Sequence, residues 1–201
     1  MNLSQATPRH PFTRAVGEFV LFVLIGVLTA AVGELQYSVF IRGDWANFYG
    51  SMVFNAVYLS GAFVVTRLLF RIFPSRVAFV ATVALAAVVG LMVEWFLIGN
   101  SPWSNPDAAQ LGMAAYWACL VVVPLIVLDG DVRLRPLRRT IVLYSLIYTA
   151  LILLGQGLIP PGEWRVACHI WTFIIGYSGL IVWCVAGYLR TIRAYGREVH
   201  K

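Results

Sequence analysis

Two carboxyl groups and one imidazole lie inside long apolar stretches of this sequence. Glu34 and Glu94 each stand near the end of such a stretch, and His169 stands near the beginning of another. A carboxyl in apolar surroundings can keep a proton available for donation, and a neighbouring imidazole can pass protons near neutral pH. Glu34, Glu94 and His169 are therefore the candidate catalytic residues.

The spacing around both glutamates indicates that they face other helices rather than lipid. Gly26 and Ala30 precede Glu34 at intervals of four residues, and an alanine and a glycine precede Glu94 in the same way. Small residues at this interval share one face of a helix and let a neighbouring helix approach closely. Both carboxyls are therefore expected to point towards protein, where they could meet each other and His169.

Further polar and aromatic residues lie on the same side of the expected membrane as the two glutamates, with Trp117 nearer the middle of its segment. They supply hydrogen-bonding groups for a small ligand, and their rings could stabilise a developing positive charge. The candidate substrate-binding residues are Asn55, Trp95, Asn100, Trp103, Gln110, Trp117 and Trp171. Two structural alternatives remain open, because the tryptophans can form an interfacial belt and Glu94 can bond Asn55 or Gln110 solely for packing.

The composition indicates the environment of these residues. Of the 201 residues, 60% are hydrophobic and 12% are charged, whereas an average soluble domain has about 25% charged residues. A soluble chain of this size could not hide so much apolar surface, and a disordered chain would be polar and poor in aromatic residues. The fold class is therefore an all-α integral membrane protein.

Six apolar segments are long enough to cross a bilayer as helices, which requires about 20 residues each. They cover residues 17–41, 50–72, 77–99, 108–128, 140–158 and 166–189. Short groups of charged and turn-forming residues separate them, and no linker-like segment divides the chain. The sequence therefore predicts one six-transmembrane-helix bundle over residues 1–201.

Basic residues set the expected orientation, because short loops rich in Arg and Lys stay in the cytoplasm. With a cytoplasmic N-terminus, Arg42 and Arg165 are the two basic residues on the outer side, and all the others fall on the inner side. An even number of spans also places the C-terminus in the cytoplasm. The expected location is a bacterial inner (plasma) membrane, with the candidate catalytic residues in the outer third of the bilayer.

The same asymmetry explains the formal net charge of +6, so no nucleic-acid partner is expected. Cys119, Cys168 and Cys184 lack the spacing of metal ligands, and His169 has no second histidine within a span to complete a bis-histidine haem site. The single lysine, Lys201, lies outside the apolar segments, which excludes Schiff-base chemistry there. We therefore expect neither a metal nor a cofactor.

Polar residues concentrate at the outer ends of the segments, whereas the inner halves are almost wholly apolar. A path across a membrane needs polar lining along its length or broken helices at mid-depth. The pattern therefore favours a one-sided pocket that binds or chemically transforms a small lipophilic molecule, and whether the protein is an enzyme stays open. The alternatives are a proton- or cation-coupled small-solute transporter or channel, and an accessory or structural subunit of a larger membrane complex. The lipid bilayer is a partner in each case, and a homo-oligomer or a membrane-complex partner is compatible with each.

Overall fold

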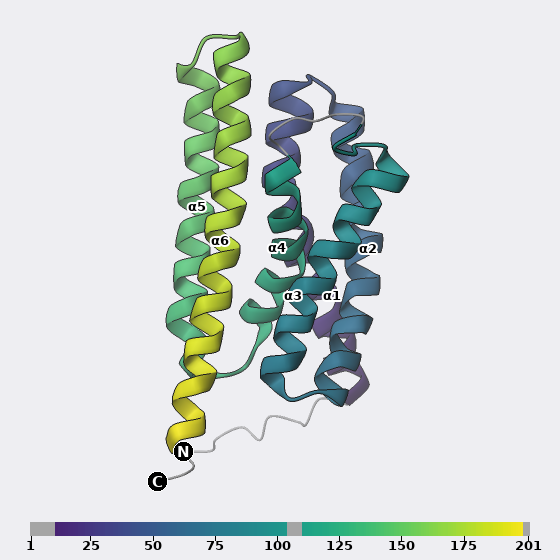
Figure 1. Ribbon diagram of the computed structural model, residues 1–201, viewed down its shortest axis with the longest axis vertical. Coiled ribbons are helices and arrows are strands. Elements are labelled where there is room, and N and C mark those ends of the chain that lie inside the picture. Colours follow the sequence, from purple (N-terminus) through teal and green to yellow (C-terminus); the bar gives the residue numbers. More distant parts are fainter. Residues whose placement is uncertain (1–10, 104–109, 199–201) are drawn as a thin grey trace, which may run out of the picture.

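The computed structural model describes residues 11–103 and 110–198 and is built from helices (Figure 1). No strand occurs in these two ranges, which confirms the all-α prediction. The elements are α1 (Pro11–Glu34), the π-helix η1 (Leu35–Ile41), α2 (Trp45–Ile72), α3 (Ser75–Met92), the π-helix η2 (Val93–Ile98), α4 (Gln110–Leu128), the short 3₁₀-helix η3 (Val132–Leu134), α5 (Arg135–Leu158) and α6 (Glu163–Glu198).

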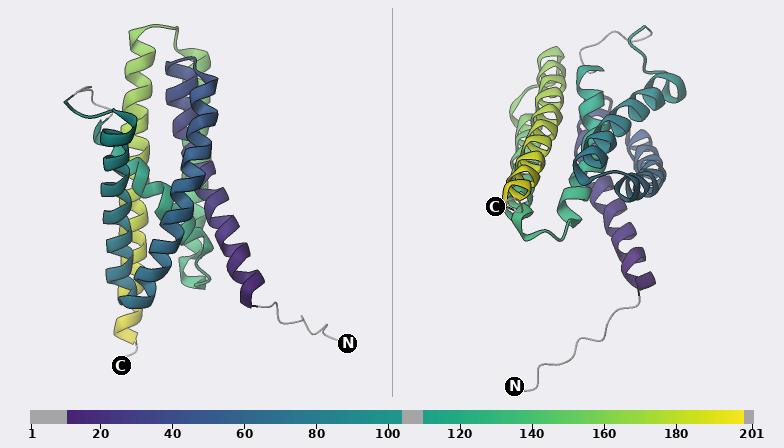
Figure 2. Two further views of the ribbon diagram at one scale, coloured as in Figure 1. Left: turned by 90° about the vertical axis from the view of Figure 1, so that its right-hand side faces the viewer. Right: turned by 60° about the horizontal axis from the view of Figure 1, so that its bottom comes forward.

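Helix α4 occupies the centre of the bundle. It packs against α1, α3 and α6, and Figure 2 shows it between the α5–α6 hairpin and the group formed by α1, α2 and α3. Every side chain from Tyr116 to Pro124 is buried. Because α4 is enclosed by protein on these faces, its sequence is apolar around the whole circumference rather than along one stripe.

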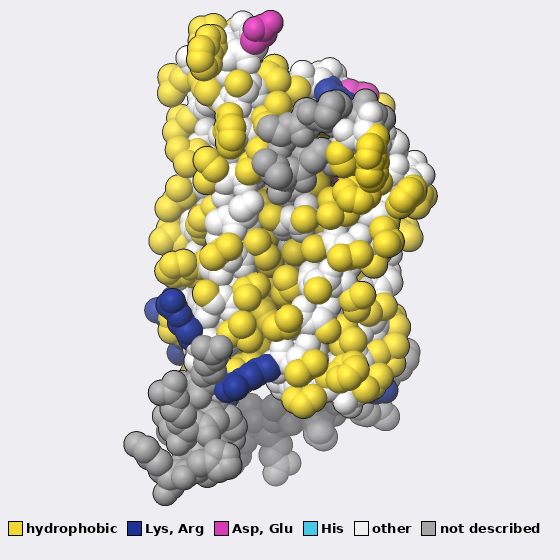
Figure 3. Space-filling model, in the orientation of Figure 1, with side chains coloured by type: hydrophobic (Ala, Val, Ile, Leu, Met, Phe, Trp, Pro, Cys, Tyr) yellow, Lys and Arg dark blue, Asp and Glu magenta, His cyan; other side chains and the backbone are white. Residues whose placement is uncertain are grey.

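The outside of the bundle is apolar along its length. On the face that Figure 3 shows, hydrophobic side chains cover most of the length of the molecule and charged side chains lie towards its two ends, and large hydrophobic side chains of α1, α2, α3, α5 and α6 are exposed. Within the described residues, five helices are long and apolar enough to cross a membrane, and a shorter apolar helix covers Gly112–Leu128. The helices coincide with the six segments expected from the sequence, and their arrangement is that of a polytopic membrane protein. The number of spans and the orientation stay predictions.

Small residues on α1 and α3 let these helices approach α4 closely. A Cβ atom at Gly26 would stand 2.9 Å from the carbonyl oxygen of Leu120, and Pro124 has no N–H to donate to that carbonyl within the helix. On α3, a Cβ atom at Gly90 would stand 2.0 Å from Cγ of Trp117. The four-residue spacing of small residues therefore marks the faces that pack on α4.

An arginine-rich connection joins α4 and α5 at the end of the bundle where α1 begins and α6 ends (Figure 1). Hydrogen bonds from Arg133 to Asp131 lower the pKa of that carboxyl to about 2. Arg138 donates to the backbone carbonyl of Asp129 at 2.6 Å. These contacts organise the turn, while Arg135 and Arg139 stay exposed.

We expect Gly90→Ala to lower the free energy of unfolding by about 1–3 kcal/mol or more, because the added methyl group meets the base of a buried ring that cannot rotate away. Gly61→Ala on α2 is the matched control, since a Cβ atom there meets nothing within 4 Å. That substitution should be neutral or slightly stabilising. Thermal unfolding of both variants in one detergent measures the difference, and equal midpoints would contradict this packing.

Candidate functional site

A cavity of about 440 Å³ lies at the end of the bundle opposite the arginine-rich connection. Residues of α1, η1, α2, η2, α4 and α6 form its wall. The polar side chains among them are Glu34, Gln36, Arg42, Asn47, Ser51, Asn55, Glu94, Asn100 and His169. The larger apolar and aromatic ones are Tyr37, Ile41, Phe54, Ile98, Met113, Tyr116, Trp117, Ile170 and Phe173. A concave site of this size with mixed lining is typical of small-molecule binding.

Both glutamates stand where an α-helix changes into a π-helix. Glu34 is the last residue of α1 before η1, and Glu94 is the second residue of η2. A π turn contains more residues than an α turn, so it rotates the side chains that follow, and such insertions are frequent at functional sites. In η1 the rotation leaves Gln36 and Ser38 buried at the end of an otherwise apolar helix.

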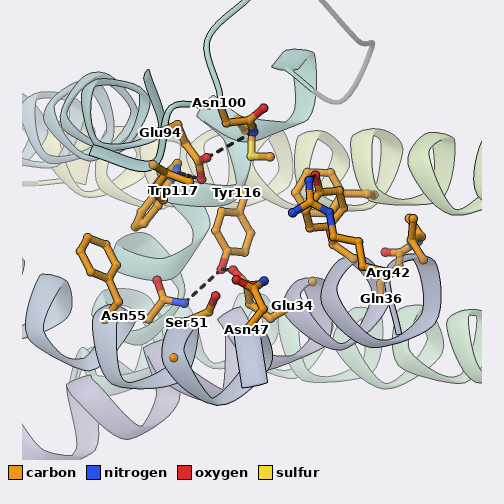
Figure 4. A pocket seen from close by; sticks show the side chains of 18 of the residues that line it. Glu34, Gln36, Arg42, Asn47, Ser51, Asn55, Glu94, Asn100, Tyr116 and Trp117 are labelled. Carbon is orange, nitrogen blue, oxygen red and sulfur yellow. Dashed lines mark hydrogen bonds between the residues drawn. The ribbon is translucent and has the colours of Figure 1, made fainter. Parts of the chain in front are cut away.

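Hydroxyl groups from three elements surround the carboxyl of Glu34. Tyr116 of α4 donates to Oε1 at 3.0 Å, and Ser38 of η1 donates to Oε2 at 3.1 Å. Ser51 of α2 also hydrogen-bonds to the carboxyl, and Arg42 lies close enough to interact with it electrostatically. Glu34 therefore belongs to a polar cluster that includes one positive charge (Figure 4).

Two neutral N–H groups hold the carboxyl of Glu94. Trp117 Nε1 donates to Oε1 at 3.2 Å, and Asn100 Nδ2 donates to Oε2 at 3.4 Å. The left-handed backbone of Gly99, with φ of 80°, ends η2, and the N–H of Asn100 then donates to the carbonyl oxygen of Glu94 at 2.8 Å. The glycine turn after η2 therefore brings Asn100 back to the acid that precedes it.

Adjacent residues of α4 connect the two carboxyls. Tyr116 reaches Glu34 on α1, and Trp117 reaches Glu94 in η2 (Figure 4). Successive side chains of an α-helix point about 100° apart, so two adjacent residues of α4 can contact two different neighbours, here α1 and η2. The sequence analysis singled out Trp117 and missed Tyr116, although its position beside Trp117 was a usable signal.

Asn55 joins this network from α2. Its Nδ2 donates to the hydroxyl oxygen of Tyr116 at 3.3 Å, while that hydroxyl uses its own hydrogen on Glu34. The amide nitrogen of Asn55 therefore faces Tyr116, and the amide oxygen points towards the side where Trp117 and Glu94 lie (Figure 4). Asn55 is 1% exposed, and within the described residues its Oδ1 has no hydrogen-bond partner.

His169 is held by Gln36. The Nε2 of Gln36 donates to the backbone carbonyl of His169 at 2.5 Å and lies 3.4 Å from Nδ1 of the ring, while Oε1 of Gln36 accepts from Tyr148 at 3.1 Å. A carbonyl oxygen can only accept, so the amide nitrogen of Gln36 faces His169, and a hydrogen bond from this nitrogen to the ring needs Nδ1 as the acceptor. In that tautomer the proton of the neutral imidazole lies on Nε2, which is buried and has no partner in the part of the chain that the structure describes.

The structure brings together many of the residues predicted from the sequence. Those that line the cavity are Glu34, Asn55, Glu94, Asn100, Trp117 and His169. The other three predicted tryptophans do not line it: Trp103 is 78% exposed, Trp171 is 56% exposed, and Trp95 packs edge-on against Trp103. Such exposure agrees with the alternative of an interfacial belt. Gln110 begins α4, but its side chain lies outside what the structure describes.

The sequence analysis also missed three residues that line the cavity: Gln36 in η1, Arg42 directly after η1, and Ser51 in α2. The π-helix decides which side chains of η1 face inward, and the α-helical spacing used for the sequence does not contain that information.

Within the described ranges, residues 11–103 and 110–198, no group of three or more His, Cys, Asp and Glu residues could hold a metal ion. No family model, curated protein or solved structure matches this chain.

We expect neutral His169 to be the Nε2–H tautomer, which ¹⁵N NMR of histidine-labelled protein can identify. Replacing His10 and His200 by Gln leaves His169 as the single labelled imidazole. Gln36→Leu should weaken the preference for the Nε2–H tautomer over the Nδ1–H tautomer, because it removes the donor that faces Nδ1. An Nδ1–H tautomer in the otherwise unchanged protein would contradict this assignment.

Proposed function

We propose that this chain is a single-domain, six-span membrane protein whose cavity, at the extracytoplasmic end, binds a small lipophilic molecule through Glu34 and Glu94. The observation that carries the proposal is that carboxyls from two different helices line one cavity, where adjacent residues of α4 orient them. Ionisable groups in membrane spans are costly, and they typically face a cavity and serve a function. In its protonated form, either carboxyl can also donate a proton to a bound molecule.

The length of α4 supports counting it as a sixth span. Its 19 residues extend over about 28 Å at about 1.5 Å per residue, close to the roughly 30 Å thickness of a hydrocarbon core. Being enclosed by other helices, α4 needs no long lipid-facing stripe of its own.

The distribution of arginines supports a cytoplasmic location for both ends of the chain. One end of the bundle holds the α2–α3 turn, the α4–α5 connection and the last part of α6. The arginines at or near this end include Arg71, Arg76, Arg135, Arg139 and Arg190. The opposite end, where the cavity lies, carries Arg42 and Arg165. Because basic loops are retained in the cytoplasm, the cavity is assigned to the outer side.

The wall of the cavity favours a ligand with an apolar body. Phe54, Met113, Ile170 and Phe173 line it together with the rings of Tyr116 and Trp117. A ligand gains affinity here by removing apolar surface from water, while the few polar groups orient it. A purely polar solute would leave these side chains without a matching surface.

The packing beneath the cavity favours binding over transport. On α4, the residues from Leu120 to Pro124 and Ile126 are buried against neighbouring helices, and their side chains are apolar. A transported polar solute would need hydrogen-bonding groups along this part of its path. In the described residues, polar groups concentrate instead around the cavity at one end of the bundle.

The first test is mass spectrometry of small molecules that copurify with the protein in detergent. We expect a defined lipophilic compound with the wild-type protein and about ten- to a hundredfold less of it with Glu94→Gln or Glu34→Gln, because each loses a charged hydrogen-bonding group worth about 1.5–3 kcal/mol. Glu163→Gln is the matched control, since this exposed glutamate begins α6 and does not line the cavity.

Retention must be compared among folded proteins, so each variant is first checked for a single gel-filtration peak and an unchanged unfolding temperature. A compound that both cavity variants retain as well as the wild type would rule out a role for the carboxyls. If the wild-type protein carries only bulk lipid, binding assays with added lipophilic molecules are needed, and failure of those would reject the proposal.

A further inference from the structure

The carboxyl of Glu94 is buried without a neighbouring positive charge. Glu94 is 7% exposed, and its hydrogen-bond donors, Trp117 and Asn100, are both neutral. Among the described residues, no Lys, Arg or His forms a salt bridge with it, and the charged group that acts on it is the other carboxyl, Glu34. Burying a carboxylate costs free energy unless a cation or a proton compensates it.

Glu34 differs from Glu94 in this respect. It has the positive charge of Arg42 near it and hydroxyl donors from Tyr116, Ser38 and Ser51. The single guanidinium that lines the cavity is therefore on the side of Glu34, and Figure 4 places it away from Asn55 and Trp117. Among the described residues, the protein therefore supplies no cation to balance a negative charge on Glu94.

The amide oxygen of Asn55 is an acceptor that no described residue satisfies. Its direction is set by the hydrogen bond from its Nδ2 to Tyr116, so the amide cannot turn over without losing that bond. A buried acceptor without a donor costs about 1–3 kcal/mol in a folded protein. A ligand with an N–H or O–H group would remove this cost.

Three aromatic rings, those of Phe54, Tyr116 and Trp117, line the cavity, and Tyr58 packs against Trp117 from outside it. The Trp117 ring packs against Tyr58, Phe54 and Tyr116, with ring centroids 4.7, 6.4 and 5.5 Å apart, and its N–H points at Glu94. The face of an aromatic ring attracts a cation, most strongly when water is excluded. The unbalanced carboxyl, the free acceptor and the rings in this part of the cavity therefore all favour a positively charged group that carries N–H donors.

We infer that the ligand of this cavity carries an ammonium group, bound between the carboxylate of Glu94 and the amide oxygen of Asn55 beside Trp117. An ammonium ion has several N–H donors and so can serve more than one acceptor, and its charge balances the buried carboxylate. The apolar remainder of the molecule fills the part of the cavity lined by Met113 and Phe173. This inference rests on the proposed function and adds the chemical class of the ligand, an amphipathic amine.

The test compares three probes with the same apolar chain and different heads: hexylamine, 1-hexanol and hexanoate. Native mass spectrometry of the detergent-solubilised full chain near neutral pH, where hexylamine is an ammonium ion, gives the affinity of each. We expect hexylamine to bind at least about tenfold more tightly than 1-hexanol, and hexanoate to bind most weakly.

Four variants locate the ammonium group. Glu94→Gln and Asn55→Leu should each reduce the preference for hexylamine over 1-hexanol about tenfold or more. Asn55→Asp should keep the preference, since it retains an acceptor and adds negative charge, and it guards against misfolding of the leucine variant. Gln156→Leu is the matched control, because the amide oxygen of Gln156 is also without a partner among the described residues, but Gln156 does not line the cavity.

The outcomes separate this inference from the proposed function. If 1-hexanol or hexanoate binds as tightly as hexylamine and Glu94→Gln weakens that binding, the cavity binds a lipophilic ligand but the ammonium assignment is wrong. An undiminished amine preference in both Glu94→Gln and Asn55→Leu would also overturn it. If none of the three probes binds in a Glu94-dependent way, the proposed function and the inference fail together.

Discussion

The close packing of α1 and α3 on the central helix α4 is the constraint on which the site depends. Glycine at positions 33 and 90 leaves room for large rings: a Cβ atom at Gly33 would stand 3.1 Å from Tyr116, and one at Gly90 would stand 2.0 Å from Trp117. The rings therefore lie directly against the neighbouring backbones. At this separation the hydroxyl of Tyr116 and the indole N–H of Trp117 reach carboxyls on two different helices.

The π-helical ends of the first and third long helices give these carboxyls their surroundings. An α-helix continued through the same residues would present its side chains with a period of 3.6, whereas the π turns add a residue and bury Gln36 and Ser38. The cost of burying polar groups is offset by hydrogen bonds between them, as in the chain that runs from Asn55 through Tyr116 to Glu34. Three buried atoms, on Asn55, His169 and, away from the cavity, Gln156, have no such partner in the described part of the chain.

These polar groups concentrate at one end of a molecule that is otherwise apolar inside and along its sides. In lipid, an unsatisfied polar group has no water to bond, so polar residues gather where other protein groups or a cavity can satisfy them. Beneath the cavity, aliphatic residues of α4 close the bundle, and at the opposite end the arginines meet solvent. This division between a polar end and an apolar remainder supports the proposal that the polar end binds a ligand.

By itself the sequence determined the helical class, the approximate limits of the helices and the residues with which Glu34 and Glu94 share a helix face. These features depend on local composition and on the α-helical period, which can be read from one segment at a time. It also singled out Asn55, Asn100, Trp117 and His169, because polar and aromatic groups in apolar segments stand out. Only the tertiary structure decided that these residues line one cavity while Trp103 and Trp171 stay outside it. It also supplied Tyr116, Gln36 and Arg42, since contacts between helices and the change from α to π geometry depend on how segments far apart in the sequence pack together.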